Sequence, residues 1–111
     1  MNLPKASNDL YCLVHYLSYV KKLPDDSLYA LSVQHDKQHD AENRRDPRAF
    51  CYVEKFDPST IHCSKIIECL PPRARIGILL HEIGHIFLGA FHGDESEVDV
   101  DSWCVNAVPE A

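Results

Sequence analysis

The sequence predicts an α+β fold in one domain that spans residues 1–111. Three observations support this prediction. The chain has 111 residues, of which 45% are apolar and 25% are charged, and this is the size and balance of one compact globular domain. Apolar residues recur at helical spacing near both ends of the chain. Short segments of alternating apolar residues lie between those ends, so we expect helices packed on a small sheet.

The first helix is expected over residues 8–22. Leu10, Leu13 and Leu17 recur there at helical spacing, and Pro24 stops the pattern. Residues 28–34 then alternate between apolar and polar side chains, which predicts a strand, although a short helix that starts at Asp25 fits the same residues.

The middle of the chain predicts a loop followed by a hairpin. Residues 35–48 are polar and have no apolar periodicity, so we expect a loop in which His35 and His39 are solvated. Residues 49–55 and 60–63 predict two strands, because the segment between them has the composition of a turn. Together these strands predict a small antiparallel sheet.

Two further helices are expected in the second half. Pro71 and Pro72 suit the entry of a helix, and residues 76–91 are long and strongly apolar, which predicts a buried helix. Gly93 ends that segment and Asp94 can cap the next one, so we expect a last helix over residues 95–107.

Charge, cysteine content and hydropathy exclude several classes of function. The chain has 11 Lys and Arg against 17 Asp and Glu, a net charge of −6, and it has no basic cluster for a nucleic-acid backbone. It has no apolar run long enough to span a membrane and no export signal. Five cysteines with no paired spacing predict reduced, mostly buried thiols. We therefore expect a cytoplasmic protein without direct contact to nucleic acid or membrane.

The expected buried helix carries a His-Glu-x-x-His motif at His81, Glu82 and His85. Two imidazoles one helical turn apart face the same way and can share one Zn²⁺ ion. Glu82 is then placed to act as the general base on a water molecule. Buried polar groups without partners destabilise a fold, and metal coordination supplies partners for the imidazoles. The alternative is that both histidines are core residues bonded to backbone carbonyls.

A catalytic zinc needs a third protein ligand, and the downstream residues offer three candidates. His92 extends the motif, but the glycine and third histidine of the metzincin pattern lie one residue earlier. Glu97 and Asp101 are four residues apart on one face of the last expected helix. This spacing predicts Glu97 as the third ligand and Asp101 as the acceptor of a ligating histidine's outer N–H. Asp99 is a fallback ligand, and capping by Glu97 and plain solvation of Asp101 remain alternatives.

These residues resemble a known group of enzymes, the gluzincins, in which an HExxH helix is followed by a second helix with Glu-x-x-x-Asp. Within that group, residues 81–89 followed by Glu97, Asp101 and Trp103 look like the ImmA/IrrE metallopeptidases and related small phage-borne peptidases. The resemblance covers about residues 73–108. Val100 is bulkier than the small residue that the family usually has before the Asp, and the first half of the chain does not align with the family.

The resemblance implies a minimal zincin-like domain and a zinc metalloendopeptidase of phage or bacterial origin. It implies one Zn²⁺ per chain held by His81, His85 and Glu97, with Glu82 as general base and Asp101 behind a histidine ligand. The expected partner is a protein or peptide substrate, with a regulatory protein among the candidates, held along the strand predicted at residues 49–55. The alternative function is a zinc-containing interaction module without turnover, which has the same ligands.

Overall fold

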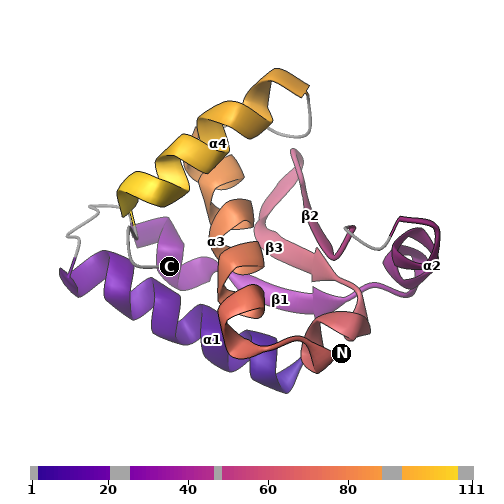
Figure 1. Ribbon diagram of the computed structural model, residues 1–111. Helices are drawn as coiled ribbons and strands as arrows, with labels where there is room; N and C mark the ends of the chain where they lie inside the picture. Colours follow the sequence, from indigo (N-terminus) through magenta and orange to yellow (C-terminus); the bar gives the residue numbers. More distant parts are fainter. Residues whose placement is uncertain (1–2, 21–25, 47–48, 89–93, 108–111) are drawn as a thin grey trace.

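The computed structural model describes residues 3–20, 26–46, 49–88 and 94–107, and within these ranges it leaves out the side chains at 26–27, 94–99 and 107. Figure 1 shows an α+β arrangement of helices around a small sheet, which confirms the predicted fold class. In chain order the elements are α1 (Pro4–His15), a π-helical turn (Tyr16–Val20), a 3-10 helix (Asp26–Ala30), β1 (Ser32–His35), α2 (Lys37–Arg45), β2 (Cys51–Glu54), β3 (Asp57–Cys63), a second 3-10 helix (Lys65–Cys69), α3 (Pro72–Leu88) and α4 (Asp94–Ala107).

The sheet is mixed, and the prediction of an antiparallel sheet is therefore wrong in part. The strand order is β1-β3-β2, in which β2 and β3 form the expected antiparallel hairpin and β1 runs parallel to β3. Parallel neighbours need a crossover between them, and α2 with β2 supplies it here. Only Ser32–His35 of the expected strand at 28–34 is extended, because Leu28 belongs to the 3-10 helix before it.

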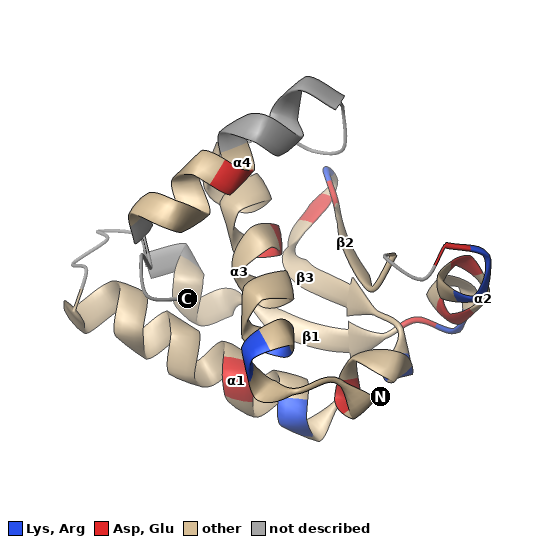
Figure 2. Ribbon diagram, viewed as in Figure 1, with Lys and Arg blue, Asp and Glu red and all other residues tan. Residues whose placement is uncertain are grey.

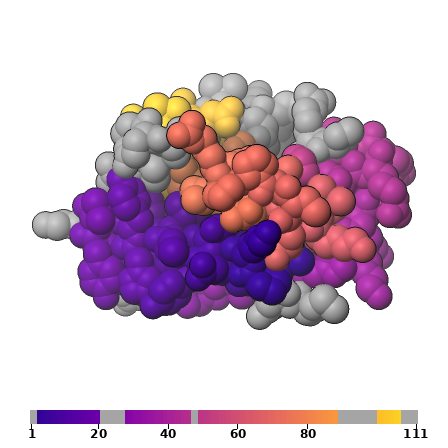
Figure 3. Space-filling view, turned by 60° about the horizontal axis from the view of Figure 1, so that its bottom comes forward, coloured from indigo at the N-terminus to yellow at the C-terminus, as the bar shows by residue number. Residues whose placement is uncertain are grey.

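Helix α1 begins earlier than the expected residue 8 because a distant side chain caps it. Pro4 occupies the first turn, where its missing N–H costs nothing. The backbone N–H groups of Lys5 and Ala6 donate to the Glu68 carboxylate at 3.1 and 3.0 Å. Figure 3 shows the result from outside: α1, in indigo, lies against the segment that contains residues 65–80. Such a cap cannot be read from local sequence.

Helix α2 corrects the predicted loop at residues 35–48. Asp36 caps the helix by accepting a hydrogen bond from the Gln38 N–H at 2.8 Å. The buried residues of α2 are His39 and Asn43, both polar. A helix whose buried face is polar leaves no apolar periodicity in the sequence, which is why the pattern indicated a loop.

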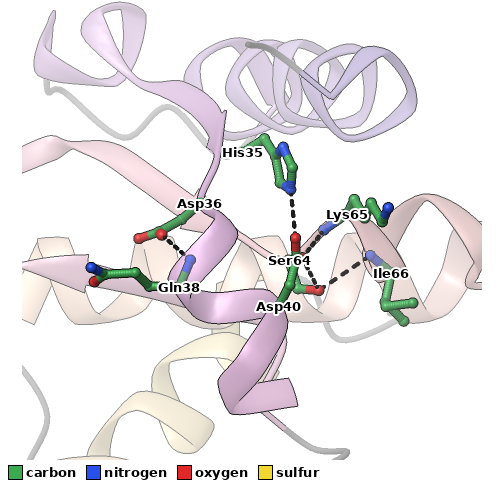
Figure 4. A network of polar contacts seen from close by, with 7 residues as sticks. All are labelled: His35, Asp36, Gln38, Asp40, Ser64, Lys65 and Ile66. Carbon is green, nitrogen blue, oxygen red and sulfur yellow. Dashed lines mark hydrogen bonds and ion pairs between the residues drawn. The ribbon is translucent and has the colours of Figure 1, made fainter. Parts of the chain in front are cut away.

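The side chain of Asp40 connects α2 to the ends of β1 and β3 through hydrogen bonds, as Figure 4 shows. Its carboxylate accepts hydrogen bonds from the Ser64 hydroxyl at 2.8 Å and from the Lys65 N–H at 3.0 Å. Its other oxygen lies 2.9 Å from Nε2 of His35. His35 is thus paired with a carboxylate and not solvated as expected, and His39 is buried.

Two cysteines correct the expectation of reduced thiols. Cys51 of β2 and Cys63 of β3 are directly paired across the hairpin and form a disulfide. Their spacing of 12 residues has no diagnostic pattern, so only the strand register reveals the pair. Cys12 and Cys69 are exposed, and Cys104 is half-buried.

Helix α3 packs between α1, the sheet and α4. The buried helix expected at residues 76–91 is confirmed, but it starts at Pro72, and residues 89–91 lie outside the described part of the chain. Its apolar buried residues meet the inner face of the sheet, α1 and the π-helical turn; fully buried residues of this contact include Leu17, Val33, Val53, Ile61, Leu79 and Ile83. The radius of gyration of 13.0 Å is that of a compact domain of this length.

Figure 2 shows basic residues on α2 interspersed with acidic ones, with no basic face among the residues it describes. Within the described ranges, no helix is both long and apolar enough to cross a bilayer.

Candidate metal centre between α3 and α4

Helix α3 brings the two motif histidines together. His81 and His85 are one turn apart, and their Nε2 atoms are 3.2 Å from each other. The rings are nearly perpendicular, at 82°, with centroids 4.8 Å apart. The outer nitrogens of the two rings therefore lie within hydrogen-bond distance of each other, on the same side of α3, as the i,i+4 spacing predicts.

The motif is set deep in the fold. His85 is 1% exposed and Glu82 is 4% exposed, while the His81 side chain is 27% exposed. A carboxylate and an imidazole that are this deeply buried need polar or charged neighbours, because burial of an isolated charge is strongly unfavourable. His81, the least buried of the three, forms the boundary between this buried group and solvent.

Helix α4 adds a carboxylate to the same place. Oδ1 of Asp101 lies 3.2 Å from Nδ1 of His81, and the Asp101 side chain is 72% exposed. A carboxylate at Nδ1 favours the tautomer whose proton is on Nδ1, and this leaves Nε2 with a lone pair. The predicted contact between Asp101 and a motif histidine is thus present in the geometry, with His81 as the partner.

The contact between α3 and α4 is held by apolar packing. Val100 is fully buried, and the ring of Trp103 stacks on that of Phe87 with centroids 5.4 Å apart. Gly84 of the motif faces α4 at its closest approach. These contacts fix where α4 crosses the motif helix.

The thiol of Cys104 in α4 has a raised pKa. Burial of its thiol, together with the negative charges of Asp101 and Glu82, raises its pKa to about 11. The thiol is therefore protonated at neutral pH. The nearby carboxylates add to the effect of burial, which is the larger cause and disfavours any charged group here.

A groove of about 450 Å³ opens beside the motif. Phe50 and Cys51, at the start of β2, line one side of it, and Ala74, Gly77 and Ile78 of α3 line the other. His81 and Glu82 form its inner end. Because β2 is an outer strand of the sheet, this groove runs between an edge strand and the motif helix.

The residues present fit a zinc ion. Zn–N bonds of about 2.0–2.1 Å in a tetrahedral site put two ligating nitrogens about 3.3 Å apart. The observed separation of 3.2 Å between the two Nε2 atoms matches this spacing without rearrangement. Imidazole nitrogens and carboxylate oxygens are the donors of typical catalytic zinc sites.

The described side chains supply only part of a complete ligand set. Among them, no group of three His, Cys, Asp or Glu residues is placed to hold a metal ion. Glu97 and Asp99 lie in α4, but their side chains belong to the stretch that is not described. His92 falls outside the described ranges altogether. The identity of the third ligand stays a prediction.

Comparison with protein-family models, with curated proteins and with solved structures gives no match to this chain. The assignment of a function rests on the residues and geometry described above.

The groove was not expected from the sequence. Its lining comes from two segments that are distant in the sequence, residues 50–51 and 74–82, and no local sequence pattern indicates that they lie side by side. One signal was present: Gly77 interrupts an apolar helical segment, and a glycine inside a helix usually has a packing or functional reason.

Proposed function

We propose that the protein is a zinc-dependent metallopeptidase with a zincin-like domain of the gluzincin type, similar to the ImmA/IrrE peptidases. The observation that carries this proposal is the convergence of the His81 and His85 Nε2 atoms at 3.2 Å, with the buried Glu82 carboxylate on the same helix. His81, His85 and Glu97 would hold the ion. Asp101 would orient His81 through Nδ1.

Glu82 is the general base of this proposal. When bound, zinc supplies Lewis-acid chemistry, which lowers the pKa of a water molecule and polarises the carbonyl of the scissile bond. Glu82 takes a proton from the attacking water as the new C–O bond forms. It then gives that proton to the amide nitrogen as the C–N bond breaks, so the products are a carboxylic acid and an amine. No covalent intermediate with the protein is needed.

The groove and the edge strand support a peptide as substrate. An extended chain can add to the outer edge of β2 through backbone hydrogen bonds and so pass Glu82 and His81 at the inner end of the groove. The substrate would be a protein or peptide segment, because this shallow site beside a strand suits an extended chain.

The test separates a peptidase from a zinc-containing interaction module. The variant is Glu82→Gln, measured for zinc by mass spectrometry and for cleavage of a fluorescence-quenched peptide library. We expect cleavage to fall at least about a hundredfold, the typical contribution of a general base, while zinc is retained. Glu42→Gln, an exposed residue of α2, is the matched control and should change neither property. Zinc in both proteins and cleavage by neither would favour the interaction module.

A further inference from the structure

The two glycines of α3 have different surroundings. A Cβ atom added at Gly84 would lie 2.9 Å from Cγ1 of Val100, so close packing requires glycine there. A Cβ atom added at Gly77 would meet nothing within 4 Å. Glycine is less favourable than alanine inside a helix, and packing does not account for its presence at Gly77. A glycine that weakens a helix without improving its packing points to a functional reason for its presence.

Gly77 stands where a side chain would narrow the groove. Ala74, Gly77 and His81 follow one another at intervals of three and four residues, so they lie along one face of α3. This face is one wall of the groove, and Phe50 is part of the opposite wall. Without a side chain at Gly77, the groove is open for its whole length up to His81 and Glu82.

The lining gives the groove its chemical preference. Among the described residues that line the groove, Phe50, Ala74 and Ile78 have apolar side chains, and the ionisable ones are His81 and Glu82. The groove is open to solvent, and its volume of about 450 Å³ is large enough to take an aromatic side chain. A charged side chain would lose hydration there without a partner along the apolar walls.

We propose that this groove binds a bulky apolar side chain of the substrate, aromatic or long aliphatic, next to the scissile bond, and that Gly77 sets its size limit. The role in substrate selection rests on the proposed peptidase function, whereas the binding of an apolar side chain does not. Gly77 acts on specificity alone and takes no part in the chemistry.

The experiment compares Gly77→Leu with the wild type in two measurements. The first is binding of N-acetyl-phenylalanine amide and of N-acetyl-alanine amide, followed by NMR shifts of the backbone amides at residues 74–82. The second is the cleavage profile on the peptide library. Arg73→Leu is the matched control, because it adds the same side chain to an exposed position of α3 that does not line the groove. Ala74→Leu narrows the same wall and serves as a second test if Gly77→Leu does not fold.

We expect the wild type and Arg73→Leu to bind the phenylalanine probe at these amides and to cleave beside bulky apolar residues. Gly77→Leu should bind this probe at least about tenfold more weakly and shift cleavage toward small residues, since a difference of one or a few methylenes in a pocket discriminates by about that factor. Binding of the phenylalanine probe without peptide cleavage would support the proposed apolar groove and contradict the proposed peptidase function. Cleavage without a preference for bulky apolar residues would contradict the proposed role of the groove and leave the peptidase function standing. A preference that is the same in Gly77→Leu and the wild type would do the same. Neither binding nor cleavage would overturn both.

Discussion

Gly84 of α3 and Val100 of α4 are in direct contact, and there is no room for a methyl group between them. A Cβ atom at position 84 would lie 2.9 Å from Cγ1 of Val100 and 3.1 Å from the Trp103 ring. Such distances are well inside van der Waals contact, so any side chain at position 84 would push the two helices apart. Since α4 carries Asp101, this contact sets the position of the Asp101 carboxylate relative to His81.

Gly84→Ala should therefore destabilise the protein. We expect the free energy of unfolding to fall by about 1–3 kcal/mol, the usual effect of overpacking, when it is measured by urea denaturation. Gly77→Ala, on the same helix, is the matched control and should raise it by about 0.4–1 kcal/mol, because nothing lies within 4 Å of the new methyl group. Equal effects of the two substitutions would contradict the packing of α4 on Gly84.

The purified protein should contain one zinc ion per chain, measured by mass spectrometry on protein made without a metal-affinity tag. His81→Ala and Glu97→Ala should each lose it, and a chelator should lower the Tm of the wild type because metal binding stabilises the folded state. Asp99→Ala is the control and should keep its zinc. Zinc retained in Glu97→Ala would move the third ligand to Asp99 or His92, and absence of metal in the wild type would leave the histidines as core residues.

Asp101→Ala should weaken zinc binding about 10–100-fold without abolishing it. The reason is that the Asp101 carboxylate, 3.2 Å from Nδ1 of His81, orients the ring but does not face the point where the two Nε2 atoms converge. The affinity can be measured by competition with a chromophoric chelator. Ser102→Ala, at the neighbouring exposed position, should have no effect. An unchanged affinity in Asp101→Ala would mean that the contact is a surface ion pair only.

Reduction of the disulfide between Cys51 and Cys63 should lower the free energy of unfolding by about 2–3 kcal/mol. The bond closes a loop of 12 residues, and breaking it restores conformational freedom to the unfolded chain. Urea denaturation with and without a phosphine reductant measures the difference. Cys12→Ala, at an exposed position, should change it by less than about 0.5 kcal/mol. A wild type insensitive to the reductant would show that the two thiols are not bonded in solution.

Stability should fall in acid through Asp40. Burial of this carboxyl acts to raise its pKa, but hydrogen bonds from His35, Ser64 and the Lys65 N–H lower it from 3.8 to about 2. A lowered pKa in the folded state stabilises the protein above the unfolded value, and this contribution is lost as the pH falls from about 4 to about 2. Asp40→Asn should therefore show a shallower loss of stability over this window in urea titrations. An equal slope in both proteins would exclude Asp40 as the cause.

Sequence patterns identified the elements that bury apolar residues. The periodicity of Leu10, Leu13 and Leu17 and the apolar segment around the motif both correspond to helices. The hairpin is present, but its turn lies at residues 55–56, and residues 57–59 of the expected turn belong to β3. The three motif residues fall where the i,i+4 rule places them, with the two histidines in contact. These features depend on neighbours within a few residues along the chain.

The features that escaped prediction depend on distant residues. Helix α2 is bound to the rest of the fold through Asp40, whose partner Ser64 is 24 positions away along the chain. The start of α1 depends on Glu68, and the disulfide depends on the register of β2 with β3. The groove likewise needs Phe50 to lie beside Gly77. No local periodicity records such contacts, because tertiary partners decide them.

The parallel pairing of β1 with β3 determines when during folding the site can form. Tyr52 and His62 are neighbours across a hairpin, but Val33 and Ile61, which are paired between β1 and β3, are 28 positions apart along the chain. Closing the longer loop costs more chain entropy, so the hairpin can form within microseconds while β1 joins the sheet later. Helix α3 lacks part of its apolar support until β1 and α1 have docked. We therefore expect the tertiary surroundings of the site to form later than the helix that holds the histidine pair.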